Sequence, residues 1–322
     1  MRYINETLVI FSHDFYCQDV FDVIGKIDFC PYMQIFYPYA IQVYNSQFPG
    51  DDPKDCPRNL EKEEARRRKC NNAEYQDPYR HYREAQEAQV KHHWLWKVQF
   101  IFENCSLLRN FEGILFLVED DFYLAEDTLY YLKKLERQGR IHCPECKMYI
   151  MGQTTDYSQD EYQSGAAKKD YWWVGNGLGM ALRKYFWKLF KYCKKSFCFF
   201  DDCNWDSTLM VVTATCIPGG LKILKPLGSR VFHLGSCEGF HRHKAWKTTD
   251  VLNKVLRTLN HNRNYLFPEH VFVASDFPVL VKRTTPYGGW TDIRDHEMCL
   301  RIFNNQSLST ADLRKIHQNL FT

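Results

Sequence analysis

The sequence predicts an α/β protein in which helices flank a sheet. Short apolar strands alternate with stretches of helical spacing along most of the 322 residues. Apolar residues make up 45% of the chain and aromatic residues 16%, so it can bury a large core, as one big domain or two smaller ones. A formal charge of only +3 and the lack of low-complexity stretches exclude an intrinsically disordered chain.

The first part of the chain is expected to hold two strands and two helices. In order, they are strand 8–14, helix 17–26, strand 33–37 and helix 79–104. The Pro-, Asp- and Asn-rich residues 48–80 read as an irregular surface loop that Cys56 and Cys70 could staple. Loops of this length are usually functional, so this one is a candidate part of a site.

The later part of the chain continues the alternation. The expected elements are strand 113–118, helix 126–137, strand 147–152, helix 184–193, helix 204–216, strands 221–225 and 229–235, and a helix from about 246. YWWVGNGLGMALRK, residues 171–184, suggests two short strands separated by glycines. Asp201 or Asp202 is expected to cap the helix that starts near residue 204.

Cysteine usage indicates an oxidising compartment. The chain has 13 cysteines but a single CxxC, Cys143 to Cys146, so disulfides explain the count better than a structural zinc. Asn-x-Ser/Thr sequons at Asn5, Asn104 and Asn305 fit the same compartment. Together these features favour the lumen of the secretory pathway.

Two kinds of partner are not expected. The basic run RRRK, residues 66–69, reads as a solvated loop rather than a nucleic-acid patch. No apolar stretch approaches the ~20 residues that cross a bilayer, and the first residues lack the regions of a signal peptide. A targeting or anchoring segment is therefore expected to lie upstream of residue 1 or to be missing, and contact with a membrane is expected only through such an upstream segment.

The acidic end of one strand is the first candidate site. In ILFLVEDDFYLA, residues 114–125, the carboxylates Glu119, Asp120 and Asp121 directly follow an apolar run. Crowded like charges cost free energy unless something positive joins them. Ligands collect at the carboxyl ends of strands in α/β sheets, and Mg²⁺ or Mn²⁺ there could bridge a nucleotide diphosphate. A strand that has simply reached solvent is the alternative, and this stretch alone does not decide.

Two further residues are candidates for chemistry. His233 follows a short strand, and an imidazole beside a carboxylate suits Mn²⁺ better than Mg²⁺. Asp206 lies beside Trp205 in the first turn of its expected helix, where the dipole keeps a carboxylate ionised and able to act as a base for a sugar hydroxyl. From the residues alone, a half-buried structural histidine and a favourable first-turn charge are the simpler interpretations.

A series of unusual strings in one order carries a family resemblance. They are IFSHD (10–14), QFPGDDPKDCPR (47–58), NAEYQD (72–77), HYREA (81–85), KHHWLWK (91–97), ILFLVEDDFYLA (114–125), CPEC (143–146), DDCNWD (201–206), VFHLG (231–235) and GGWTDIRDHEMC (288–299). Through them the sequence resembles the alpha-1,6-mannosyl-glycoprotein 2-beta-N-acetylglucosaminyltransferase (N-acetylglucosaminyltransferase II) family of Golgi enzymes.

The resemblance implies a fold, a reaction and a location. The fold is glycosyltransferase A, a Rossmann-like mixed sheet flanked by helices, in a single catalytic domain over residues 1–322. The reaction is an inverting transfer of N-acetylglucosamine from UDP-N-acetylglucosamine to the 2-hydroxyl of the alpha-1,6-linked mannose of an N-glycan on a glycoprotein, with Mn²⁺ as cofactor. The location is the Golgi lumen, as a type II membrane protein in its complete form.

The family pattern also implies roles for single residues. Asp121 and His233 match metal ligands, and Asp206 matches the general base. The positions that match donor binding or a place in the site are Asp14, Arg58, Gln89, Val90, Lys91, His92, His93, Glu119, Asp120, Asn176 and Trp205. The implied disulfides are Cys56–Cys70, Cys143–Cys146, Cys193–Cys216 and Cys198–Cys299.

The sequence departs from the family pattern at three points. Cys237 lacks its family partner, since Ala245 stands there, and Cys203 is a conceivable new partner. Asn176 is the nearest equivalent of a donor-site asparagine. The opening strand of the family, with its Val-His-Asn-Arg-like nucleotide motif, has no counterpart, so the sheet is expected to lack its first strand and the chain to be incomplete at its N-terminus. Two alternatives stay open: a related transferase with another acceptor, and an inactive lumenal glycan-binding relative.

Overall fold

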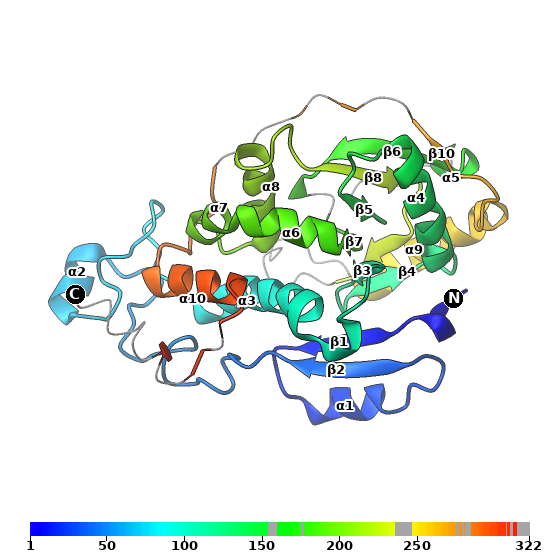
Figure 1. Cartoon of the computed structure of the whole chain (residues 1–322). Helices are drawn as coiled ribbons and strands as arrows, with labels where there is room; N and C mark the ends of the chain where they lie inside the picture. The colour runs from blue at the N-terminus through cyan, green and yellow to red at the C-terminus, as the bar shows by residue number, and fades with distance from the viewer. Residues whose placement is uncertain are drawn as a thin grey trace. The chain divides into compact units, whose positions relative to one another are not determined.

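The chain forms two compact units (Figure 1). The computed structural model describes residues 1–153, 160–174, 177–235, 247–274, 277–278, 280, 285–306, 308–309 and 312–313. The first unit consists of Met1–Thr7, Glu112–Phe186 and Ile217–Val281, and the second of Leu8–Phe111, Trp187–Cys216 and Lys282–Thr322. A single catalytic domain over the whole chain stays a prediction.

A mixed six-stranded sheet is the framework of the first unit. Its strand order is β10-β6-β8-β5-β7-β3. The strands are β3 (Ile114–Leu117), β5 (Met148–Ile150), β6 (Ala166–Tyr171), β7 (Met180–Arg183), β8 (Lys222–Pro226) and β10 (Phe272–Val273). β5 is parallel to β8 and β6 to β10, whereas β7 is antiparallel to both β3 and β5. The predicted α/β class with a mixed sheet is confirmed.

Helix α4 (Thr128–His142) covers part of this sheet (Figure 1). Its buried side chains Tyr131, Leu132 and Leu135 recur at the spacing of one helix face. They pack in one apolar cluster with Tyr149 of β5 and Leu224 of β8. The sequence predicted this helix over 126–137, and the structure extends it to His142.

A second, two-stranded sheet in the first unit matters most for the site. β4 (Phe122–Leu124) and β9 (Val231–His233) are antiparallel, and Phe122 is opposite His233. Phe232 is fully buried in a cluster with Val255 and Leu259 of α9 (Thr248–His261). This cluster fixes β9, and through the strand pairing it fixes the residues at the start of β4. The unit also contains η1 (Ile4–Glu6) and α5 (Asp160–Gln163).

The second unit opens with a parallel strand pair. β1 (Val9–His13) and β2 (Tyr32–Phe36) are joined through α1 (Gln18–Ile24), as the sequence predicted. In the ranges that the structure describes, β1 pairs with β2 alone. The absence of a first strand from the sheet stays a prediction.

Helices make up most of the rest of the second unit. α3 (Ala85–Gln99) contacts α8 (Trp205–Thr215) and α10 (Ile293–Phe303), and α7 (Lys194–Phe199) contacts the same two helices. α3 was predicted over 79–104; it starts later, at Ala85, and continues from Phe100 to Asn104 as a π-helix. α6 (Lys184–Tyr192) begins in the first unit and ends in the second.

The basic run 66–69 was predicted to be a loop, and that prediction is wrong. Residues 66–68 end helix α2 (Lys62–Arg68). Arg66 contacts Glu63 and Glu74 at 3.0 and 2.8 Å, and Arg68 contacts Glu64 at 2.7 Å, all on the exposed surface. The glutamates one turn away favour the helix and neutralise the run, so its solvated character is as expected.

All four cysteine pairs implied by the resemblance are bonded in the structure. They are Cys56–Cys70, Cys143–Cys146, Cys193–Cys216 and Cys198–Cys299. The CxxC therefore forms a disulfide instead of contributing to a zinc site. Cys203 is a buried free thiol, and Cys237 lies outside the described residues. None of the helices in the described part of the chain has the length and apolar character needed to cross a membrane.

The predicted cap of α8 is wrong. The N-cap residue is Asn204, and neither aspartate caps the first turn. Asp202 Oδ1 instead accepts hydrogen bonds from the backbone N–H and from the side-chain amide of Asn204, both at 2.9 Å. Asp201 Oδ1 accepts from the N–H of Trp290 at 2.9 Å. The two carboxylates organise the loop before the helix rather than the helix end itself.

Candidate active site

The three predicted carboxylates of the first unit form the tight turn between β3 and β4. The N–H of Phe122 donates to the carbonyl of Glu119 at 3.2 Å, which closes the turn. Glu119 and Asp120 are exposed, whereas Asp121 is half-buried. The carbonyl of Asp121 accepts from the N–H of Leu234 at 2.9 Å. Asp121 is therefore the one carboxylate of the triplet that the β4–β9 ladder brings beside His233.

Asp121 and His233 are in direct contact. Asp121 Oδ2 lies 2.8 Å from His233 Nε2, and the two side chains are 37% and 32% exposed. The hydrogen bond with Asp121 raises the pKa of His233, against the opposing effect of burial. Asp121 Oδ1 is buried and has no hydrogen-bond partner within the part of the chain that the structure describes. Such an unmet carboxylate oxygen is costly and marks a place for a further ligand.

Gly235 completes this arrangement, and sequence reasoning missed it. A Cβ atom at this position would lie 2.3 Å from Asp121 Oδ2 and 2.9 Å from His233 Nε2. No side chain fits there without moving both groups. The signal was present in the string VFHLG, but a glycine two residues after a histidine becomes informative only once the carboxylate is known to lie against it.

The donor set fits a divalent cation. Oxygen and nitrogen ligands bind such ions at about 2.0–2.2 Å, so two neighbouring ligands of one ion lie about 3 Å apart. The 2.8 Å between Asp121 Oδ2 and His233 Nε2 satisfies this requirement, and a carboxylate with an imidazole suits Mn²⁺ better than Mg²⁺. Over the described ranges, no group of three or more His, Cys, Asp or Glu side chains could hold a metal ion. A bound ion would thus depend on other oxygens, such as those of a diphosphate.

Three predicted donor-binding residues of the second unit lie together. Gln89 and His93 are one turn apart on α3 and face Asp14, which follows β1. Gln89 Nε2 donates to Asp14 Oδ2 at 3.3 Å, and His93 Nδ1 lies 3.5 Å from the same oxygen. The hydrogen bond with His93 lowers the pKa of Asp14, and burial lowers the pKa of His93. An ionised carboxylate held at a strand end can accept hydrogen bonds from a nucleotide.

The rest of the predicted stretch from Gln89 to His93 does not join this group. Val90 is exposed, whereas Lys91 and His92 are buried. Lys91 Nζ donates to the carbonyl of Asp202 at 2.6 Å, and burial lowers the pKa of Lys91 to about 7. His92 Nε2 lies 3.0 Å from Asp295 Oδ1. The five consecutive residues therefore have four different surroundings, because α3 is exposed on one side and has neighbours on the others.

The start of α8 holds the predicted base. Asp206 is half-buried in the first turn, and its Oδ1 accepts from the N–H of Ser207 at 2.7 Å. Trp205 stacks on Trp94 of α3 with ring centroids 4.7 Å apart and an interplanar angle of 4°. The N-terminal end of the helix favours the ionised form of Asp206, as a proton acceptor requires.

Arg58 belongs to the same unit as Asp206. It pairs with Glu84, and its Nη1 lies 3.6 Å from Glu87 Oε1. The thiol of Cys203 donates to Glu87 Oε2 at 3.3 Å, which links this acidic pair to the loop that precedes α8. The remaining predicted residue, Asn176, lies outside the described residues.

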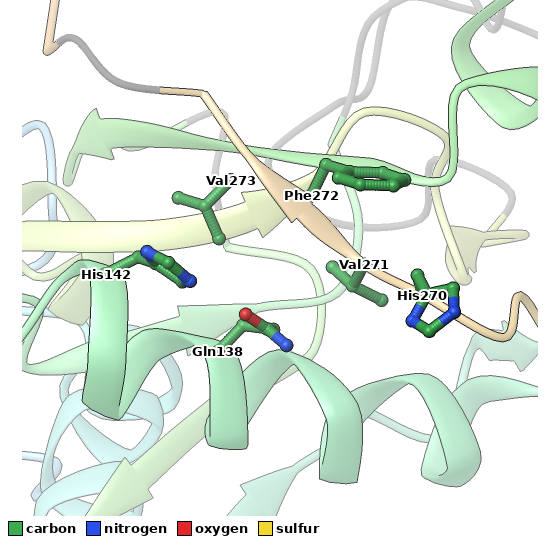
Figure 2. Close-up of a pocket in the computed structure, with 6 residues that line it drawn as sticks. All are labelled: Gln138, His142, His270, Val271, Phe272 and Val273. Atoms are coloured by element: carbon green, nitrogen blue, oxygen red, sulfur yellow. The ribbon is translucent and has the colours of Figure 1, made fainter.

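A surface pocket of the first unit lies elsewhere (Figure 2). Gln138 and His142 of α4 line one side, and residues 270–273, which include β10, line the other. None of the predicted site residues lines it. The pocket therefore does not add to the candidate site, which rests on the carboxylate and histidine geometry above.

Comparison with known proteins places the chain in a family. Residues 1–299 match the family described as N-acetylglucosaminyltransferase II (MGAT2). Proteins named alpha-1,6-mannosyl-glycoprotein 2-beta-N-acetylglucosaminyltransferase are 40% identical over 298 residues in Rattus norvegicus and 39% over 301 in Homo sapiens. One from Arabidopsis thaliana is 27% identical over 306 residues.

These matches cover 92% of this chain and 67%, 66% and 68%, respectively, of the rat, human and Arabidopsis proteins. The chain thus spans about two thirds of the length of these relatives. The match extends through every string that carries the candidate ligands and base. The chain belongs to the N-acetylglucosaminyltransferase II family.

Proposed function

We propose that this chain is a Mn²⁺-dependent, inverting glycosyltransferase of N-glycan processing, with a glycosyltransferase A fold, that works in the Golgi lumen. It transfers N-acetylglucosamine from UDP-N-acetylglucosamine to the 2-hydroxyl of the alpha-1,6-linked mannose. Family membership and the names of the relatives support the reaction. The structural observation that carries the proposal is the contact of Asp121 with His233, together with one Asp121 carboxylate oxygen that has no hydrogen-bond partner among the described residues.

The residues divide the chemistry between them. Asp206 accepts the proton of the mannose 2-hydroxyl as that oxygen bonds to the anomeric carbon and the bond to UDP breaks on the opposite face, which inverts the configuration. Asp121 and His233 would hold Mn²⁺, which supplies positive charge to the departing diphosphate when bound. Asp14, with Gln89 and His93 behind it, binds the donor.

A transfer assay on two acceptors tests the proposal. Purified protein is incubated with UDP-N-acetylglucosamine, Mn²⁺ and an N-glycan that exposes mannose on either the alpha-1,6 or the alpha-1,3 arm, and the product linkage is determined by NMR. We expect beta-1,2 transfer to the alpha-1,6 arm, lost with EDTA and restored by Mn²⁺. Transfer to the other arm alone would indicate a related enzyme with another acceptor. Glycan binding without any UDP release would indicate an inactive relative.

A further inference from the structure

We propose that Lys91 is a positioning residue for the reaction: it holds the loop that starts α8 and thereby places Asp206. This inference rests on the proposed function, in which Asp206 is the base. It differs from the family expectation for the stretch from Gln89 to His93, which is donor binding.

The contacts of Lys91 all belong to the surroundings of that loop. Its ammonium donates to the carbonyl of Asp202 at 2.6 Å and to that of Phe200 at 3.5 Å. It lies 4.0 Å above the ring of Trp290 and 5.0 Å from that of Phe197. The side chain is completely buried, so the charge depends on these partners. Lys91 therefore acts on the loop from inside the core.

Asp202 connects Lys91 to the start of α8 through hydrogen bonds. Its carbonyl oxygen, which Lys91 holds, also accepts from the hydroxyl of Thr208 in the first turn of α8 at 3.1 Å. Its Oδ1 binds the N–H of the N-cap residue Asn204, and its Oδ2 accepts from the N–H of Tyr287 at 3.1 Å. One buried residue thus joins Lys91, the helix start and a second loop. A shift of Asp202 would shift the first turn, which carries Asp206.

Two side chains on one face of α3 support the start of α8. Lys91 and Trp94 are three residues apart and share that face, and Trp94 stacks on Trp205, the neighbour of Asp206. Gln89 and His93 are turned toward Asp14 instead. At its other end α8 is followed by Cys216, which is bonded to Cys193. The geometry assigns Lys91 to the support of α8, on a side of α3 other than the one that faces Asp14.

The test uses Lys91→Met, which keeps the length of the side chain and removes its charge and donors. We expect kcat to fall about tenfold, as for other small misplacements of a catalytic group, whereas the Mn²⁺-dependent affinity for UDP stays within twofold of wild type. Lys188→Met, an exposed lysine of α6, is the control and should leave both values unchanged. Unchanged kcat in Lys91→Met, or a large loss of UDP affinity, would overturn the inference.

A double variant separates this inference from the proposed function. Because Lys91 acts through Asp206, Lys91→Met should add little to the loss of turnover in Asp206→Asn. The same tenfold factor in both backgrounds would show an independent role and refute the positioning. Wild-type turnover of Asp206→Asn alone would instead remove the base from the proposed function. If Asp206→Asn loses turnover while Lys91→Met keeps normal turnover, only the inference about Lys91 is wrong.

A second variant avoids disturbing a buried charge. Thr208→Val removes the other side-chain donor to the Asp202 carbonyl, together with the bond of the same hydroxyl to the Asn204 carbonyl at 2.8 Å. We expect a loss in kcat of about fivefold, the effect of losing one hydroxyl donor that the two carbonyls share, with unchanged UDP affinity. If Lys91→Met does not fold, this variant decides: normal turnover would overturn the inference, and a selective fall in kcat would uphold it.

Discussion

Two aspartates of this protein, Asp295 and Asp121, differ in how many of their carboxylate oxygens have a partner. In the second unit, Asp295 is completely buried, and both of its oxygens are taken: Oδ2 by Arg83 Nε at 2.7 Å and Oδ1 by His92 Nε2 at 3.0 Å. Burial raises the pKa of Asp295, but Arg83 and His92 outweigh it and hold the pKa well below its usual range. In the first unit, Asp121 is half-exposed and has His233 on one oxygen, while its other oxygen has no hydrogen-bond partner in the ranges that the structure describes.

The difference separates a carboxylate that is fully paired within the core from one that could still bind a ligand. A carboxylate that is buried in the core with both oxygens paired to basic side chains is part of the packing of the fold. A partly exposed carboxylate beside an imidazole, with no room for a side chain at Gly235, retains that capacity. Residue type alone does not distinguish the two, since both pair an aspartate with a histidine.

The largest expected effect concerns the site carboxylate. Asp121→Ala should abolish Mn²⁺-dependent UDP binding in titration calorimetry, because it removes the negative ligand, while the free energy of unfolding changes by less than about 0.5 kcal/mol. His233→Ala should weaken UDP binding less. Glu126→Ala, which removes an exposed carboxylate of the same unit outside the predicted site, is the control and should bind UDP normally. Unchanged Mn²⁺-dependent affinity for Asp121→Ala would mean that the acidic triplet is only a strand end.

The buried carboxylate should show the opposite response. Asp295→Ala leaves the buried Arg83 without its carboxylate partner, and we expect a loss of about 3–5 kcal/mol in the free energy of unfolding measured with denaturant. Glu297→Ala on the same helix removes the half-exposed pair with Arg301, 2.6 Å apart, and should cost less than about 1 kcal/mol. Equal costs for the two variants would contradict the distinction drawn between buried and surface charges.

Gly235 offers a more graded test of the first unit. Gly235→Ala places a methyl group 2.3 Å from Asp121 Oδ2, so the carboxylate or the backbone has to move. We expect the Mn²⁺-dependent affinity for UDP to fall about tenfold, or about 1.4 kcal/mol, with the fold retained. Gly219→Ala is a control for an added carbon that meets nothing, since no atom lies within 4 Å of it; Gly219 has a left-handed backbone and is the more strained position of the two. Wild-type affinity in Gly235→Ala would show that the close packing around the pair is not needed.

The most gradual effect, spread over a range of pH, concerns Lys91, a buried lysine held by carbonyl oxygens rather than by a carboxylate. Its pKa is about 7 in the folded protein and about 10.4 in an unfolded chain, so between these values the unfolded state binds more protons. Stability should therefore rise with pH over this window, by at most about 1.4 kcal/mol per pH unit from this group. Denaturant unfolding at pH 7 and pH 8.5 should show a greater gain for the wild type than for Lys91→Met. Equal gains would mean that Lys91 stays protonated.

Much of the fold was predictable because the signals are local. Strands and helices such as β1, α1, β2 and α4 appear within a few residues of their predicted bounds, since apolar periodicity and turn residues act over short distances. The cap of α8 was not predictable. Asp202 is a residue type that caps helices and lies next to the helix start, but its carboxylate accepts hydrogen bonds from Asn204 and from the distant Tyr287. The contact with Tyr287, far away in the sequence, is one that the local capping pattern does not reveal.

The sequence by itself determined which side chains are available: an acidic strand end, a histidine after a second strand, a carboxylate in a first helical turn, and cysteines whose pairing the family resemblance supplied. Only the tertiary structure decided how they are used. Asp121 and His233 are 112 residues apart and meet because β4 pairs with β9 in one register, whereas Gln89 and Lys91, two residues apart, belong to different surroundings because a helix turns them away from each other. Periodicity describes one segment at a time, while a site depends on register and packing between segments, which no single segment encodes.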